Sequence, residues 1–188
     1  KFPAESHIGF YMMFSAAILA NKLVDFVPKA LIKNNLDNIS SYSFLFFRTK
    51  KIDQLVKDNI EKIEQFVILG AGFDLRSVKF NNDNLIIFEL DKKNTQKLKF
   101  DTLKKANIST KNISYIECDL NNNEWSNDLI NNGFNKNKKT LFLFESVSCY
   151  LEEKIVNKVL STINNISAKE SIVIQDFYST RFLHQDEF

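Results

Sequence analysis

The arrangement of apolar residues changes in character near residue 64. From Phe10 to Glu64 the apolar side chains recur at helical spacing, which predicts helices packed by one face. Beyond Glu64, short and wholly apolar runs alternate with helix-like stretches, and the runs cover residues 66–69, 85–88, 113–116, 141–144 and 172–174. Such runs are typical of strands buried on both faces of a parallel sheet. The alternation therefore predicts the α/β class, with a wound sheet and right-handed crossovers.

A single domain is expected, because 188 residues exceed a typical domain of ~150 residues only slightly and no Gly/Ser/Pro-rich linker divides the chain. Within it, residues 1–64 are predicted to form an N-terminal helical cap and residues 65–188 the wound core. A doubly wound domain usually has more sheet after its fifth strand, yet only Ser179 to Phe188 remain here. We therefore expect the C-terminal portion of the sheet to be missing, because the chain is a fragment or because that portion is lost or replaced.

Composition excludes several classes of function. The net charge of +2 gives no electrostatic reason to expect nucleic acid or an anionic membrane as a partner. With two Cys and two His, a disulfide framework and a Cys/His-rich zinc site are excluded, and no metal site is expected. The apolar stretch from Ile8 to Ala20 is shorter than the ~20 residues of a membrane span, and a buried helix is favoured there over a signal peptide.

The two cysteines are expected to be free thiols. Cys118 follows the third predicted strand and Cys149 the fourth, and wound sheets place the first and second strands between these two. That separation exceeds the reach of a disulfide. Free thiols are typical of a reducing compartment, so a cytoplasmic protein is expected.

Candidate chemistry lies directly after the apolar runs, because ligands of open α/β sheets bind beyond the carboxyl ends of the strands. Gly70 and Gly72 follow the first run, where two glycines permit a sharp turn and the close approach of a ligand. The third glycine of a dinucleotide fingerprint is absent, since Leu75 stands in its place. A purely structural tight turn is the alternative interpretation.

Three further strand ends carry carboxylates. Asp91 lies about 20 residues beyond the glycines, a position that suits bidentate hydrogen bonds to ribose hydroxyls. Asp119 can accept from an exocyclic amine while Leu120 covers one face of a purine. Glu145 follows three apolar residues, where a carboxylate is costly without a partner such as a ligand ammonium. Each carboxylate alone could be merely solvated, but their coincidence with the glycine turn indicates a ligand.

These groups favour S-adenosylmethionine over a dinucleotide. A pyrophosphate is doubly negative and would be repelled by Asp119 and Glu145, whereas S-adenosylmethionine offers ribose hydroxyls, an adenine amine, an ammonium and a sulfonium. Its one carboxylate needs a cation, and Arg48 is the best candidate because a guanidinium matches a carboxylate bidentately. A surface charge is the alternative interpretation of Arg48.

Taken together, the motifs resemble those of the leucine carboxyl methyltransferase family. The likeness spans about residues 46–178. It rests on five motifs: Arg48-Thr49 with Asp53, the run Leu-Gly-Ala-Gly-Phe-Asp-Leu-Arg at 69–76, Phe-Glu-Leu-Asp at 88–91, Asp119-Leu120, and Phe-Glu-Ser-Val at 144–147 with Tyr150-Leu151. It implies a Rossmann-like class I methyltransferase that uses S-adenosylmethionine to methylate an oxygen. The implied acceptor is a carboxylate or hydroxyl, on a small molecule or at the C-terminus of a protein.

The resemblance also implies a role for each matching residue. Arg48 would bind the methionine carboxylate, Gly70 and Gly72 the cofactor through their backbone, Asp91 the ribose, Asp119 and Leu120 the adenine, and Glu145 the methionine amino end. Leu75 departs from the Thr that is common in the family, and Lys22 is the candidate for its basic N-terminal contact.

No catalytic base is predicted, because neither His7 nor His184 lies at a strand end. A carboxylate acceptor needs no base, whereas a hydroxyl acceptor does. Tyr150 is a candidate for lining the acceptor pocket, with a packed tyrosine as the alternative, and Trp125 is expected at the start of the helix after the third strand. Two rival functions remain: a catalytically inactive, partner-binding module, and an NAD-dependent oxidoreductase, which would explain neither Arg48 nor Glu145.

Overall fold

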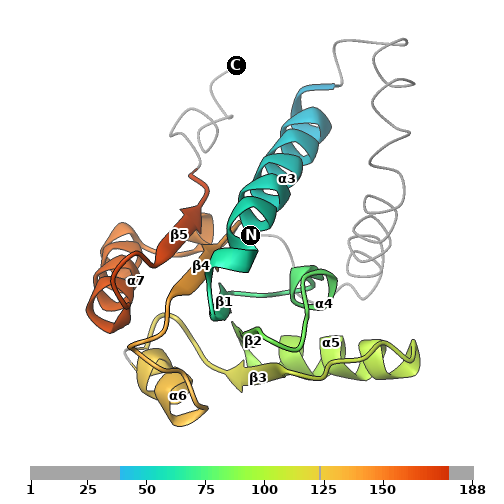
Figure 1. Cartoon of the computed structure of the whole chain (residues 1–188). Helices are drawn as coiled ribbons and strands as arrows, with labels where there is room; N and C mark the ends of the chain where they lie inside the picture. Colours follow the sequence, from blue (N-terminus) through green and yellow to red (C-terminus); the bar gives the residue numbers. More distant parts are fainter. Residues whose placement is uncertain (1–38, 123, 178–188) are drawn as a thin grey trace. The chain divides into compact units, whose positions relative to one another are not determined.

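The computed structural model describes residues 39–122 and 124–177 (Figure 1). The chain divides between Gln54 and Leu55 into two compact units. Helix α3 (Ile39–Asn59) runs through this division, and a short 3-10 helix (Ile60–Lys62) follows it. In the first unit, the rings of Phe46 and Phe47 meet edge to face with centroids 5.6 Å apart. The helix predicted at residues 8–20 lies outside the described residues.

A five-stranded parallel sheet forms the centre of the second unit. The strands are β1 (Gln65–Leu69), β2 (Ile86–Asp91), β3 (Ile113–Glu117), β4 (Thr140–Phe144) and β5 (Ile172–Gln175). Their order across the sheet is β3-β2-β1-β4-β5, and every neighbouring pair is parallel. All five apolar runs are therefore strands, as predicted. Chain order reverses between β1 and β4, which is where ligands bind in sheets of this kind.

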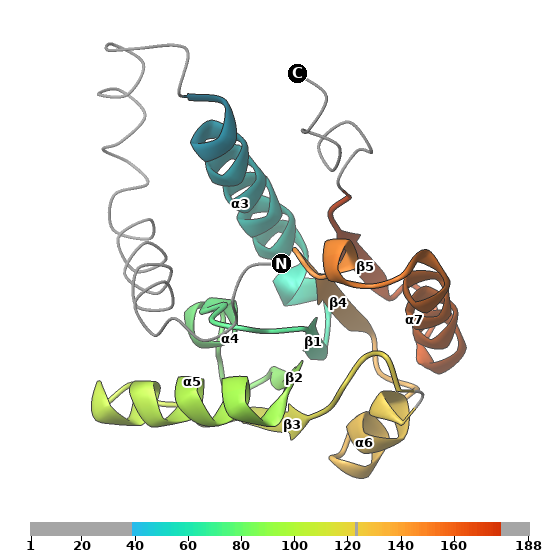
Figure 2. The same ribbon diagram turned by 180° about the vertical axis from the view of Figure 1, so that it is seen from behind.

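Helices connect the strands and cover both faces of the sheet (Figure 2). They are α4 (Arg76–Lys79), α5 (Lys93–Lys105), α6 (Trp125–Asn131) and α7 (Glu153–Ile166), and a 3-10 helix (Ser148–Tyr150) follows β4. Successive residues of a strand point to opposite faces. On β2, Phe88 and Leu90 pack with α6 and α7, whereas Glu89 between them contacts α5.

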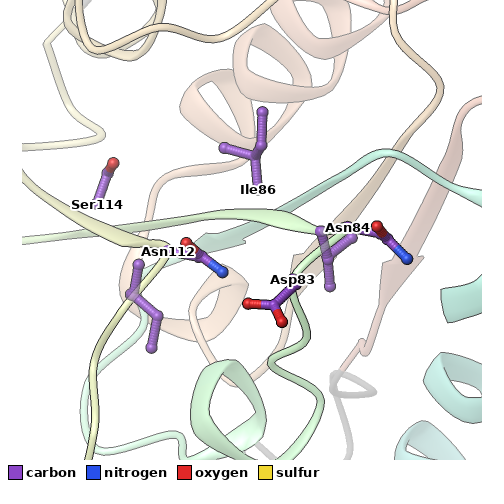
Figure 3. A pocket seen from close by; sticks show the side chains of 7 residues that line it. Asp83, Asn84, Ile86, Asn112 and Ser114 are labelled. Carbon is purple, nitrogen blue, oxygen red and sulfur yellow. The ribbon is translucent and has the colours of Figure 1, made fainter.

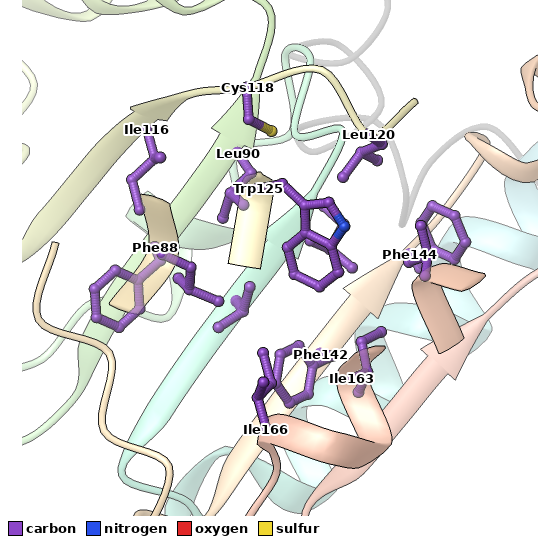
Figure 4. Packing of buried hydrophobic residues seen from close by; sticks show 14 of the residues in the cluster. Phe88, Leu90, Ile116, Cys118, Leu120, Trp125, Phe142, Phe144, Ile163 and Ile166 are labelled. Carbon is purple, nitrogen blue, oxygen red and sulfur yellow. The ribbon is translucent and has the colours of Figure 1, made fainter. Parts of the chain in front are cut away.

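A cluster of buried apolar residues lies between the sheet and helices α6 and α7 (Figure 4). Trp125 begins α6, as predicted, and is only 3% exposed within this cluster. Phe134 packs between Phe88 and Phe142, with ring centroids 6.0 and 5.9 Å away. This packing fixes the positions of the strand ends that carry the predicted ligand-binding residues.

None of the helices in the described part of the chain is both long enough and apolar enough to cross a membrane.

Candidate cofactor-binding site

The glycine-rich loop, residues 70–75, joins β1 to α4 and needs glycine at both predicted positions. Gly70 has a φ of +65°, and a Cβ built there would lie 2.5 Å from Cγ2 of Val147. Gly72 has a φ of +46°, but a Cβ there would meet only the carbonyl oxygen of Gly70, at 3.9 Å. Close packing against Val147 therefore requires a glycine at position 70, whereas the space over Gly72 is open to an approaching ligand.

Asp91 at the end of β2 is joined directly to this loop. One oxygen, Oδ2, accepts from the N–H of Gly72 at 2.6 Å, and the other, Oδ1, accepts from the N–H of Lys92 at 2.6 Å. An ionised carboxylate has about four acceptor positions, so about two remain for ribose hydroxyls. Asp91, which is predicted to bind the ribose, and the predicted glycine turn thus form one hydrogen-bonded unit.

Asp119 lies beside this unit, because the N–H of Cys118 donates to the main-chain oxygen of Asp91 at 2.9 Å. Oδ1 of Asp119 accepts from the backbone N–H of Asn121 at 3.0 Å and from its side-chain amide at 2.7 Å. These hydrogen bonds hold the pKa of Asp119 below its ordinary value, so the carboxylate stays ionised near neutral pH. Its Oδ2 lies 3.9 Å from the ammonium of Lys92 and can accept from an exocyclic amine.

A hollow of about 410 Å³ opens at this end of β2 and β3. That volume lies within the usual range of ~300–1,000 Å³ for small-molecule sites. Its walls come from the residues after β2, the residues after β3 and the start of α6: Lys92, Lys93, Glu117, Cys118, Asp119, Asn122, Glu124, Trp125 and Asp128. Trp125 therefore both packs in the core and lines the predicted adenine region, while Leu120 is buried in the core cluster.

Neither cysteine forms a disulfide, as predicted. Burial, followed by the nearby carboxylates, raises the pKa of Cys118 to about 12. Its thiol is therefore protonated near neutral pH, which argues against a role as nucleophile.

A second hollow, of about 470 Å³, lies at the opposite end of β2 and β3 (Figure 3). Its walls are Asp83, Asn84, Leu85, Ile86, Asn112, Ile113 and Ser114, none of which was predicted to bind a ligand. Because ligands bind at the carboxyl ends of parallel strands, we assign the site to the smaller hollow.

Arg76 belongs to the motif at residues 69–76, but the sequence predicted no role for it. In the structure it contacts both Asp74 and Glu145. It is 7% exposed, and its Nη1 lies 2.7 Å from Oδ2 of Asp74 and 2.5 Å from Oε2 of Glu145. Glu145 thus has a cationic partner within the protein, so its burial alone does not require a ligand ammonium. The Gly-x-Gly-x-Asp-x-Arg spacing was the available signal for this contact.

A second buried ion pair was also missed. Lys99 of α5 and Glu89 of β2 are both wholly buried, with Nζ 2.6 Å from Oε2, and Nζ also donates to the main-chain oxygen of Asp74. Burial raises the pKa of Glu89, and the ammonium of Lys99 opposes that rise. Buried Gln96 and Leu103 lie three residues before and four after Lys99, a helical spacing that marks Lys99 as facing the core.

The ends of β4 and β5 are tied together next to Glu145. Ser146 has a φ of +57°, and its N–H donates to Oδ1 of Asp176 at 2.7 Å. Nothing in the sequence analysis singled out Asp176. Tyr150 follows in the 3-10 helix and is 84% exposed.

Several predictions are not decided by this geometry. Arg48 belongs to the first unit, and its role toward the methionine carboxylate stays a prediction. Lys22, His7 and His184 lie outside the described residues. Among the residues that the structure describes, no group of three or more His, Cys, Asp or Glu side chains could hold a metal ion.

Comparison with known proteins identifies the family. The sequence model of the leucine carboxyl methyltransferase family matches residues 15–164, which is most of the chain. The chain belongs to this family. The family that the motifs resembled is thereby confirmed.

Curated relatives are named as S-adenosyl-L-methionine-dependent methyltransferases. The chain is 32% identical to the candidate S-adenosyl-L-methionine-dependent methyltransferase YktD of Bacillus subtilis (strain 168) over 124 residues, 63% of this chain and 40% of that protein. It is 30% identical to another such candidate from Mycobacterium bovis (strain BCG / Pasteur 1173P2) over 141 residues, 72% of this chain and 38% of that protein. The chain spans about 40% of the length of these relatives. Their names specify the cofactor that the strand-end residues predicted.

Solved structures share the fold. The PH0226 protein from Pyrococcus horikoshii OT3 superposes with a TM-score of 0.56 at 16% identity, covering 78% of this chain and 63% of its own. The glycopeptide N-methyltransferase MtfA, solved with sinefungin, gives 0.51 at 11% identity, covering 68% of this chain and 48% of its own. The predicted Rossmann-like methyltransferase fold is confirmed.

Proposed function

We propose that this chain forms the cofactor-binding part of an S-adenosylmethionine-dependent O-methyltransferase. The observation that carries the proposal is the hydrogen-bonded unit of Gly72 and Asp91. It combines an open approach over a glycine backbone with a carboxylate that retains acceptor positions for two ribose hydroxyls. Membership of the leucine carboxyl methyltransferase family supports the same cofactor.

Each residue of the site contributes one interaction to holding that cofactor. Asp91 accepts from the ribose, Asp119 accepts from the adenine amine through Oδ2, and Trp125 provides an apolar wall of the hollow. Glu145 attracts the methionine ammonium, and the resemblance to the family gives Arg48 the role of binding the methionine carboxylate. When bound, the cofactor supplies an electrophilic methyl group on a positively charged sulfur.

The proposed acceptor is an oxygen, and a carboxylate suits this chain better than a hydroxyl. A carboxylate is already ionised at neutral pH, so it needs no general base. The thiol of Cys118 in the hollow is protonated and supplies none. The enzyme's task is then to hold the acceptor in line with the methyl group. Tyr150 is exposed beyond the end of β4, where it can contact an acceptor.

We further propose a cytoplasmic enzyme acting on a small-molecule carboxylate or on a protein C-terminus, with no role for nucleic acid or membranes. The near-neutral charge supports this choice of partners.

Calorimetric titration of the purified full chain with S-adenosylmethionine tests the cofactor, with NADH as the comparison ligand. We expect micromolar binding of S-adenosylmethionine alone. Asp91→Ala should weaken that binding at least ~100-fold, because two hydrogen bonds to a charged acceptor are worth roughly 1.5–3 kcal/mol each and 1.4 kcal/mol is a factor of ten. Asp83→Ala is the matched control, since Asp83 is exposed at the opposite end of β2 and pairs there with the surface residue Lys111.

Each other result would contradict the proposal in a different way. Binding of NADH alone would favour an oxidoreductase. A folded chain that binds neither ligand would favour an inactive, partner-binding module. For the acceptor, transfer of a labelled methyl group should give a product that releases methanol in mild base, as carboxyl esters do, and a base-stable product would contradict the carboxylate assignment.

A further inference from the structure

The glycine-rich loop is held from the α5 side by a single buried lysine. Lys99 has no exposed side-chain surface, and its ammonium contacts Oε2 of Glu89 at 2.6 Å. The same ammonium donates to the main-chain oxygen of Asp74, within the loop. One side chain thus joins α5, β2 and the loop.

Stability alone gives a weak reason for a lysine at this position. Removing an ammonium from water is costly even when the charge is paired, and well-packed apolar residues often replace buried ion pairs with no loss of stability. An apolar side chain could fill the space between α5 and β2 equally well. It could not donate a hydrogen bond to the Asp74 carbonyl.

Asp74 connects the loop to Arg76 and, through Arg76, to Glu145. Its N–H donates to the oxygen of Ala71 at 2.8 Å, which closes the turn over Gly72. Its carboxylate accepts from the N–H of Arg76 at 2.7 Å and from Nη1 of Arg76 at 2.7 Å. The same Nη1 contacts Glu145 at 2.5 Å. The orientation of Asp74 therefore affects both the turn and the Arg76–Glu145 contact.

We propose that Lys99 is a positioning residue: its ammonium fixes Asp74, and through Asp74 the turn at Gly72 and the Arg76–Glu145 contact, in the geometry that receives the cofactor. Glu89 supplies the counter-charge that a buried ammonium needs. This inference rests on the proposed function, because it assigns a role in cofactor binding to a residue outside the hollow.

The test separates the charge pair from the contact with Asp74. Lys99→Met keeps an unbranched side chain but leaves Glu89 without its cation, so the informative variant is the double substitution Glu89→Gln with Lys99→Met. Glu89→Gln alone keeps the ammonium and its bond to Asp74. Lys97→Met is the control on the same helix, since Lys97 is exposed and pairs with Asp101.

Three quantities are measured for each variant of the full chain: the melting temperature, hydrogen exchange at the amides of Ala71, Gly72 and Asp74 without ligand, and the Kd for S-adenosylmethionine. We expect the double variant to melt close to the native protein, to exchange these amides at least tenfold faster, and to bind at least tenfold more weakly. Glu89→Gln should lower the melting temperature, because the buried ammonium loses its counter-charge. Its loop amides should still exchange more slowly than those of the double variant, because the Lys99 nitrogen still donates to Asp74. Lys97→Met should change nothing.

Three outcomes would overturn the proposal. The first is a double variant with native exchange and a Kd within twofold of the native value. The second is a double variant that does not fold. The third is a Glu89→Gln variant whose loop exchanges as fast as that of the double variant. The exchange measurement needs no ligand. A native chain that does not bind S-adenosylmethionine would therefore contradict the proposed function, while the exchange rates would still decide whether Lys99 orders the loop.

Discussion

Substitution of Gly70 by alanine tests whether the left-handed turn and the contact with Val147 fix the loop. Two costs add. An alanine at a φ of +65° costs roughly 1–2 kcal/mol relative to a residue without a Cβ. The new methyl group would also lie 2.5 Å from Cγ2 of Val147, and relieving such overpacking costs roughly 1–3 kcal/mol. We therefore expect Gly70→Ala to lower the free energy of unfolding by about 2–5 kcal/mol.

A double-mutant cycle separates the two costs. Val147→Ala removes both methyl groups that crowd the new Cβ but leaves the backbone strain in place. In the Val147→Ala background, Gly70→Ala should therefore cost only the roughly 1–2 kcal/mol of strain. Urea unfolding of the four proteins, followed by circular dichroism, gives the coupling energy.

Two results would refute this reasoning. If Gly70→Ala changes the unfolding free energy by less than about 0.5 kcal/mol, the loop adapts and neither constraint is real. If its cost is the same in both backgrounds, Val147 does not restrict position 70. Gly133→Ala is a useful comparison, because Gly133 also has a positive φ, +98°, but a Cβ there would meet no atom within 4 Å.

Three further changes have expected outcomes. Ser146→Gly should raise the unfolding free energy by about 0.5–1 kcal/mol, because Ser146 holds a φ of +57°; a lower melting temperature would count against strain at this position. In a Cys149→Ala background, Cys118 should react slowly with iodoacetamide at pH 8 and continue to accelerate above pH 9, since burial raises its pKa to about 12; a plateau below pH 9 would contradict this. Arg76→Met should destabilise the chain by roughly 3–5 kcal/mol in urea unfolding, because Glu145 would lose its buried cationic partner. Adding Glu145→Gln should recover part of that lost stability, and no recovery would show that the contact contributes little.

The central strands β1 and β4 could be predicted from the sequence because they are buried on both faces. Beyond their first residues, Gln65 and Thr140, both strands are wholly apolar, so the runs at 66–69 and 141–144 contain no polar position that would weaken the prediction. The apolar run at 85–88 is shorter than β2, which continues to Asp91, the residue predicted to lie at the strand end. Glu89 ended the apolar run in the sequence, but in the structure Lys99 neutralises it and the strand remains buried.

The parts of the site that follow strands were predictable for a topological reason. The carboxyl ends of parallel strands meet at one edge, so Gly72 and Asp91 could be expected to lie close together, and they share a hydrogen bond. The pairing of Arg76 with Glu145 could not be derived in this way. Charged side chains are long, and sequence separation does not determine which cation reaches which carboxylate. For Glu145, the structure shows an internal partner, Arg76, that the sequence did not predict.

The double use of Asp91 has a consequence for the evolution of the site. Its carboxylate accepts from two backbone amides while acceptor positions remain for a ligand. An asparagine there would offer one acceptor oxygen and two donor hydrogens, so it could not serve both amides and a ribose together. Drift at this position is therefore constrained twice, once by folding of the loop and once by ligand recognition. A descendant that no longer bound the cofactor would still be under selection to retain the aspartate. An aspartate at this position in a distant relative is therefore evidence for the structure of the loop, and does not by itself show that the cofactor is bound.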